Sequence, residues 1–137
     1  MKIKLMNINK YGELVEGKYP IYPYPSASGL WSSSLNLAQL TVELMDVIKG
    51  KSKIGVPQRL AKEMITPQLG KSWSGLGVFI ENKGELKITS MGWGVGFQAM
   101  IVAYPDTQIG AVILTNADLG VHQTEGIIGE ICSSLIS

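Results

Sequence analysis

The chain has 137 residues, of which 45% are hydrophobic and 17% are charged, and its 12 basic and 11 acidic residues leave a formal net charge of +1. This composition is typical of a globular domain with a buried core and excludes a disordered chain. The charges form no block, so we expect neither nucleic acid nor an anionic membrane surface as a partner.

Tyrosine and proline dominate the first part of the chain, in the stretch EGKYPIYPYPSASG. Pro20, Pro23 and Pro25 argue against a regular helix and against a central strand. We therefore predict an extended, turning segment over residues 1–30 that packs across other structure. No apolar run approaches the ~20 residues that span a bilayer, and the N-terminus lacks the apolar core of a signal peptide. As written, the chain is expected to have no membrane span and to be cytoplasmic.

Two helices are predicted over residues 31–68. Serines 32 to 34 are N-cap candidates for the first helix, and Gly50 is a natural stop after it. The spacing i, i+3, i+4 places a set of side chains on one stripe of this helix: Leu37, Leu40, Thr41, Leu44, Val47 and Ile48. The second helix is predicted to begin at Pro57 and to end before Pro67.

Antiparallel strands are predicted over residues 74–117. The runs 75–81 and 85–90 flank a glycine-containing turn, and the runs 96–104 and 110–117 flank a turn led by Pro105 and Asp106. The last two runs are almost continuously apolar, which is expected when both faces of a sheet are covered.

A final helix is predicted over residues 120–137, beginning at about Val121. Its pattern places four apolar side chains on one face: Ile127, Ile128, Ile131 and Leu135. The only cysteine, Cys132, is interpreted as a small core residue, and the only histidine, His122, as a solvated loop or helix-start residue. With one of each, neither a disulfide within the chain nor a cysteine or multi-histidine metal site is expected. Helices, an antiparallel meander and a closing helix together predict an α+β fold.

Three glycines at alternate positions stand out in the stretch SMGWGVGF, residues 90–97. Glycine weakens a strand, so either the chain bends here or something approaches its backbone closely. Two interpretations remain open: a bent strand edge that packs beneath Trp93, and a wall for a ligand. The spacing differs from a dinucleotide fingerprint and precedes a strand, which argues against phosphate binding.

Four blocks in order resemble the serine β-lactamase and penicillin-binding protein family, in the class C-type branch that includes esterases and D-amino-acid peptidases. The first block contains Gly29, Leu30, Trp31 and Ser32, followed by Leu37 and Ala38, with Asn36 where the branch usually has Asp. The others are MITPQ, GLGVFIE and GWGVGFQAMIVAYPDTQIGAVILTNADLG. The resemblance runs from about Gly12 onward and covers only the C-terminal part of the family's catalytic domain. It implies that residues 1–137 form a single, partial domain of the β-lactamase/transpeptidase-like fold.

The resemblance also implies a site. In the family, a Lys/His-x-Gly motif on one strand forms a wall of the active site and holds the substrate, and a backbone N–H nearby contributes to the oxyanion hole. Ser90, Met91 and Gly92 align with this motif, and Trp93 follows it. Gly92 fits. Ser90 lacks the cationic or imidazole group, and Met91 replaces a usually small residue.

The acyl-transfer chemistry of the family needs a serine nucleophile with a lysine three residues later, and no lysine of this chain has a serine at that spacing. Tyr-x-Asn is also absent. Ser34 and Asn36 spell Ser-x-Asn, but N-capping explains them. A Ser-His-Asp set built on His122 and Asp118 lacks the nucleophile elbow. The acidic pairs are interpreted as solubilising charges: Glu13 with Glu16, and Glu125 with Glu130. We therefore assign no catalytic residue, metal or cofactor, and expect the chain alone to be inactive.

The resemblance further implies that the strand at 110–117 pairs with an N-terminal neighbour that this chain does not supply. An open apolar edge seeks a partner, so we expect a homo-oligomer or a separately encoded N-terminal half. Two alternatives stay open beside a truncated hydrolase: a non-catalytic module that binds peptidoglycan-like peptides, a β-lactam or a protein, and an inert structural remnant. The parent substrate is unresolved among β-lactam, ester and D-peptide, and relatives are commonly extracytoplasmic.

Overall fold

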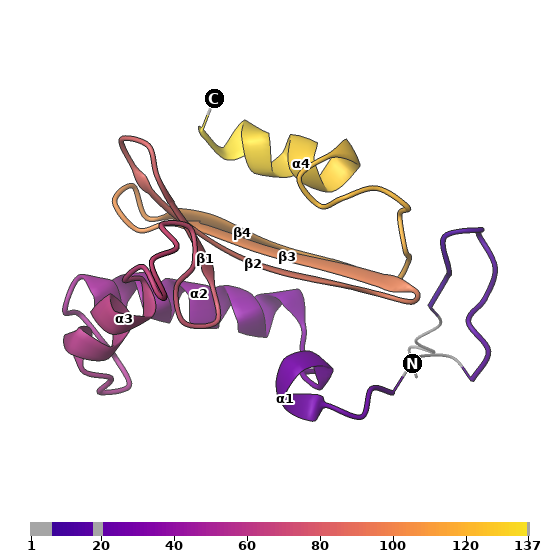
Figure 1. Cartoon of the computed structure of the whole chain (residues 1–137), viewed down its shortest axis with the longest axis horizontal. Coiled ribbons are helices and arrows are strands. Elements are labelled where there is room, and N and C mark those ends of the chain that lie inside the picture. The colour runs from indigo at the N-terminus through magenta and orange to yellow at the C-terminus, as the bar shows by residue number, and fades with distance from the viewer. Residues whose placement is uncertain (1–6, 18–20, 137) are drawn as a thin grey trace.

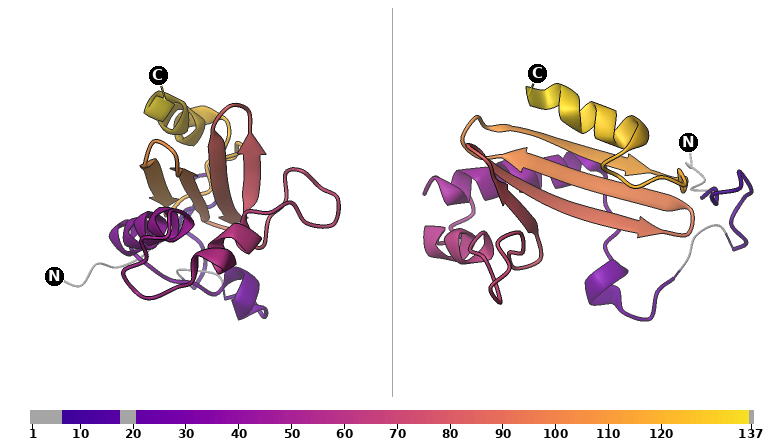
Figure 2. Two further views of the ribbon diagram at one scale, coloured as in Figure 1. Left: turned by 90° about the vertical axis from the view of Figure 1, so that its left-hand side faces the viewer. Right: turned by 45° about the horizontal axis from the view of Figure 1, so that its top comes forward.

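The computed structural model describes residues 7–17 and 21–136, and an antiparallel sheet forms its centre (Figure 1). The strands are β1 (Phe79–Asn82), β2 (Leu86–Gly94), β3 (Phe97–Tyr104) and β4 (Ile109–Thr115), and each pairs with the next along the chain. Helix α4 (Gly126–Ser133), followed by the 3-10 turn η1 (Ser134–Ile136), covers one face, and α2 (Ser34–Ile48) and α3 (Gln58–Met64) lie on the other (Figure 2). This layout confirms the predicted α+β class.

The sheet separates two apolar clusters. The cluster beneath α4 consists of Met100, Val102, Tyr104, Ile128 and Cys132. The cluster beneath α2 consists of Met45, Ile88 and Ala103. Strand β3 contributes to both and is therefore covered on both faces, as its apolar run predicted. Strand β4 has the same kind of sequence but lies at the edge of the sheet, where Ile109 is 39% and Leu114 is 38% exposed.

The first long helix has the predicted cap and stop, but its predicted stripe is wrong at Leu40, which is 58% exposed, and omits the buried Met45. Ser33 is the N-cap, and its Oγ accepts a hydrogen bond from the backbone N–H of Asn36 at 3.2 Å. Beyond the C-terminus of α2, Gly50 adopts a φ of 74°, which only glycine adopts without strain. Thr41 and Met45 are buried against the sheet. The capping residue is therefore Ser33, and Ser34 and Asn36 of the Ser-x-Asn sequence lie in the first turn of the helix.

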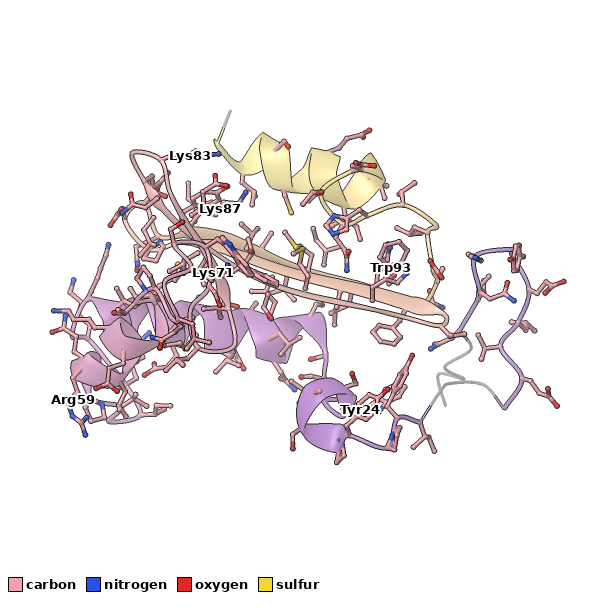
Figure 3. The ribbon with its side chains drawn as sticks, in the orientation of Figure 1. Tyr24, Arg59, Lys71, Lys83, Lys87 and Trp93 are labelled. Atoms are coloured by element: carbon pink, nitrogen blue, oxygen red, sulfur yellow. The ribbon has the colours of Figure 1, made fainter. Side chains whose placement is uncertain are left out.

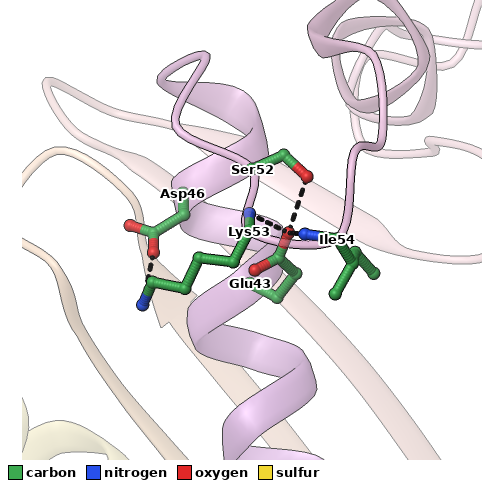
Figure 4. A network of polar contacts seen from close by, with 5 residues as sticks. All are labelled: Glu43, Asp46, Ser52, Lys53 and Ile54. Carbon is green, nitrogen blue, oxygen red and sulfur yellow. Dashed lines mark hydrogen bonds and ion pairs between the residues drawn. The ribbon is translucent and has the colours of Figure 1, made fainter.

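Glu43 ties the loop after α2 back to the helix (Figure 4). Its Oε1 accepts hydrogen bonds from Ser52 Oγ at 2.7 Å and from the backbone N–H groups of Lys53 at 2.9 Å and Ile54 at 3.3 Å. These donors, the Ser52 hydroxyl above all, stabilise the carboxylate and hold the pKa of Glu43 below its usual value of 4.5. Asp46 forms an ion pair with the Lys53 amine at 3.2 Å.

Three predicted boundaries are wrong. Pro57 is the extended N-cap of α3, not its first helical residue. Strand β1 begins at Phe79 and not at Gly75, because Gly77 turns with a φ of 72° and the backbone N–H of Leu76 bonds to the carbonyl of Met64 at the end of α3. The expected strand 85–90 continues to Gly94, so β2 and β3 form a hairpin with the two-residue loop 95–96.

The buried face of the last helix also differs from the prediction. Ile128 and Cys132 are buried, whereas Ile127 is 61% and Ile131 is 39% exposed. Both pairs have i, i+4 spacing, so periodicity alone does not choose between them. The helix begins at Gly126, after a loop that includes the exposed His122. No helix in the described part of the chain has the length and apolar character to span a bilayer.

The N-terminal segment is partly described, because residues 1–6 and 18–20, with Pro20 among them, lie outside the described ranges. Within them, Ile8 bonds to the end of β4 through Asn116 O at 2.9 Å and Asp118 N at 2.8 Å. The expectation of no helix is wrong at α1 (Pro25–Ser28), where Pro25 occupies the first helical turn and loses no hydrogen bond there.

Candidate functional site

The three glycines of the hairpin between β2 and β3 have different roles. Gly96 adopts a φ of 78°, and a Cβ there would lie 2.5 Å from the Cβ of Asn7 and 2.8 Å from Val15. A Cβ on Gly94 would overlap the Tyr22 hydroxyl and the Phe97 ring. A Cβ on Gly92 would meet the methyl group of Ala99 at an ordinary 3.7 Å. Turn geometry and packing of the N-terminal segment thus explain Gly94 and Gly96 but not Gly92.

The predicted wall, Ser90 to Trp93, occupies the second half of β2, and all four residues line one cavity of about 600 Å³. Their side chains do not share a surface, because successive strand residues point to opposite faces. Ser90 and Gly92, opposite Ile101 and Ala99, lie on the α2 face. Met91 and Trp93 lie on the α4 face, where Met91 packs against the core.

The rest of the cavity comes from segments far apart in the chain. Its apolar walls include Tyr22, Leu30, Trp31, Leu37, Phe97, Ile101 and Leu114. The Tyr22 and Phe97 rings meet edge to face, with centroids 6.4 Å apart, and the Tyr22 hydroxyl accepts a hydrogen bond from Val95 N at 3.2 Å. Asn7, which is 5% exposed, closes the hairpin end of the cavity.

The sequence did not predict these walls. The sequence indicates Trp31 only through the family resemblance, and Tyr22 only as part of a packed Tyr/Pro segment. Asn7 belongs to no motif, and Phe97 only ends the glycine-rich stretch 90–97. Their place in the cavity depends on how the N-terminal segment crosses the hairpin.

Hydrogen bonds connect the loop before α4 to the predicted wall at Gly92 and Trp93. The Nε1 of Trp93 donates to Asp118 Oδ1 at 2.9 Å, and the Nε2 of Gln123 donates to the carbonyl of Gly92 at 2.8 Å. Gln98 is 1% exposed and its Nε2 donates to the carbonyl of Val121 at 2.7 Å, whereas its Oε1 has no partner among the described residues. These bonds hold β2 and the loop as one unit.

His122 and Asp118 do not form the middle of a triad. Asp118 Oδ1 accepts from Trp93 and from the backbone N–H of Gly120 at 3.0 Å, whereas His122 Nδ1 lies 2.8 Å from the Thr124 hydroxyl. The His122 ring contacts Trp93 edge to face, with centroids 6.3 Å apart. Within the described ranges, no three His, Cys, Asp or Glu side chains are grouped as metal ligands would be.

The arrangement can therefore bind and orient a ligand but supplies no assembled proton relay. Comparison of the chain with family models, curated proteins and solved structures gives no match, so the resemblance to β-lactamase-like enzymes stays a prediction.

Proposed function

We propose that the chain supplies the substrate-facing wall of a serine β-lactamase-like acyl-transfer fold and does not catalyse acyl transfer by itself. The observation that supports this most is that the four residues aligned with the Lys/His-x-Gly region, residues 90–93, all line the cavity. In such a fold, the wall positions the substrate, and a hydroxyl and its proton acceptor perform the attack.

Ser90 is the only hydroxyl residue of the aligned motif, and it lacks a base. Lys87 lies three residues earlier on β2, and an odd separation along a strand directs the two side chains to opposite faces. Lys87 lines a second, smaller cavity beneath α4 with Tyr104 and Cys132. An oxyanion wall without an activated nucleophile stabilises an intermediate that never forms, so it does not accelerate acyl transfer.

The test is covalent labelling. The chain is incubated with a fluorescent penicillin and with a nitrophenyl ester, and its intact mass is measured, with Ser90→Ala as the matched control. We expect neither a stoichiometric adduct nor ester turnover above that of the control. An adduct on any serine overturns the proposal.

A second candidate function is reversible binding without chemistry, for example of a peptidoglycan-like peptide. The pairing of β1 with β2 ends at Phe79 and Thr89, so within the described chain the outer edge of residues 90–94 pairs with no strand. An extended peptide can add to such an edge through main-chain hydrogen bonds. Calorimetric titration with D-amino-acid dipeptides, in their acid and amide forms, measures this binding. Saturable binding with no change in the mass of the protein supports the second candidate. The absence of binding heat from both forms overturns it.

The partner of this fold is proposed to be a second copy of the chain. β4 is an edge strand with no charged residue and no proline, the usual protections of an edge, so two copies can pair there without repulsion.

Sedimentation velocity over a range of concentrations tests this pairing. We expect a dimer for the wild type and for Leu69→Lys, whose site is 98% exposed and outside the sheet, and a monomer for Ile109→Lys at the edge. A wild type that stays monomeric at high concentration, or that dimerises equally well with Ile109→Lys, contradicts pairing through β4. Association only with a separately encoded N-terminal half contradicts it as well.

A further inference from the structure

The described residues that line the cavity beside β2 are all uncharged. In the part of the chain that the structure describes, none of its lining residues is Asp, Glu, Lys, Arg or His. The labelled cations Arg59, Lys71, Lys83 and Lys87 lie at the opposite end of the sheet from Trp93 (Figure 3). The cavity therefore presents aromatic and aliphatic walls with neutral polar groups between them.

This lining disfavours an anionic ligand. An ionised carboxylate that leaves water loses a large solvation energy unless a cation or several donors replace it. Ser90, at the position where the resemblance places a cationic or imidazole group, offers one hydroxyl. A neutral amide, ester or alcohol loses far less solvation in the same cavity, so the walls select against charge rather than for it.

Asn7 and Ser90 are neutral polar residues that line the cavity. As whole residues, Asn7 is 5% exposed and Ser90 is partly buried. Neither side chain has a hydrogen bond to another residue within the described ranges. A carboxamide and a hydroxyl can each donate and accept, so together they suit a carbonyl or hydroxyl group of a ligand.

We propose that this cavity binds an uncharged, mainly apolar small molecule that carries a carbonyl or hydroxyl group. Its volume of about 600 Å³ lies within the range of small-molecule sites, whose walls are mostly apolar with a few placed polar groups. Aromatic walls formed by Tyr22, Trp31 and Phe97 suit a flat ring or an acyl chain. The inference rests on the proposed function in one respect, because both assign ligand binding to the same cavity.

A matched pair of probes tests the selection against charge. Naphthalene-2-acetamide and naphthalene-2-acetate share one ring and differ in charge at pH 7. Both are titrated into the full chain while the indole N–H signals of its three tryptophans are followed by NMR. Trp31 and Trp93 line the cavity and Trp73 does not, so Trp73 is an internal control. We expect shifts at Trp31 and Trp93 only, and at least tenfold tighter binding of the amide. Equal affinities, tighter binding of the acetate, or shifts confined to Trp73 overturn the inference.

A charge placed in the wall should invert the preference. Ser90→Lys is expected to weaken the amide and strengthen the acetate, whereas Ser72→Lys, at an exposed serine outside the cavity, leaves their ratio unchanged. The wild-type comparison stands even where Ser90→Lys fails to fold. The two proposals fail separately: a covalent adduct overturns the proposed function, and equal affinity for the two probes overturns the selection against charge.

Discussion

Gly96 and Gly84 offer a matched test of how the N-terminal segment packs against the sheet. Each lies in a hairpin loop and has a positive φ, 78° at Gly96 and 96° at Gly84. They differ in their neighbours. Nothing lies within 4 Å of a Cβ on Gly84, whereas a Cβ on Gly96 would meet Val15 at 2.8 Å and overlap Asn7. Replacing each glycine with alanine therefore separates backbone strain from steric overlap.

The magnitudes follow from these neighbours. A left-handed conformation costs an L-residue about 1–2 kcal/mol, and the smaller entropy of the unfolded chain returns about 0.4–1 kcal/mol. We expect Gly84→Ala to lower the free energy of unfolding by about 1 kcal/mol. Gly96→Ala adds overpacking of about 1–3 kcal/mol and should lose about 2–4 kcal/mol in all. Gly92→Ala should be nearly neutral, because its Cβ has room and glycine is unfavourable in a strand.

Urea unfolding followed by circular dichroism measures all three variants against the wild type. The order Gly96→Ala, Gly84→Ala, Gly92→Ala, from most to least destabilised, is the expected result. Equal losses at Gly96 and Gly84 would refute the packing of Asn7 and Val15 on the hairpin. A loss at Gly92 larger than that at Gly96 would instead mean that the crowded glycine is the one aligned with the family motif.

Three further predictions concern the core, the loop after α2 and the thiol. In dilute solution, Ile128→Ala should lower the free energy of unfolding by about 3 kcal/mol and Ile127→Ala by much less; equal losses would contradict the rotation of α4. Because the pKa of Glu43 is lowered on folding, its contribution to stability is complete above the usual value of 4.5 and is lost as the pH falls through the lowered value. The urea midpoint of the wild type should therefore fall between pH 6 and pH 3 more than that of Glu43→Gln, and parallel falls would contradict this. Burial raises the pKa of Cys132, so a disulfide reagent should label it only as urea unfolds the chain; immediate labelling in native buffer would show that α4 opens.

Some elements were predictable because their signals are local. The cap at Ser33 and the stop at Gly50 bound α2 with side chains and dihedral angles that depend on a few neighbouring residues. The glycine-containing turn is local in the same sense, although Asn82 belongs to β1 and the loop is 83–85. The apolar run of β3 is local as well. These signals place elements along the chain but not against each other.

Other features depended on tertiary contacts. The sequence of residues 75–78 suits a strand, yet its backbone bonds to the end of α3 and turns at Gly77. The rotation of α4 depends on which of two equivalent stripes meets the sheet, and Ile128 with Cys132 does so. The cavity depends on the crossing of the hairpin by the N-terminal segment, so residues such as Asn7 and Tyr22 join it without any local pattern.

Ser90 connects the two proposals through one chemical difference. The proposed resemblance places a cationic or imidazole group at this position, and a hydroxyl cannot replace its charge. Lys87 does not compensate, because the alternation of β2 directs it to the other face of the sheet. Under the proposed function, the lack of a charge at this position and the lack of an activated hydroxyl are nevertheless separate features. Restoring a cation changes which ligands enter the cavity, while turnover still requires a hydroxyl with a base beside it. Binding selectivity and acyl transfer in this chain should therefore respond independently to substitution.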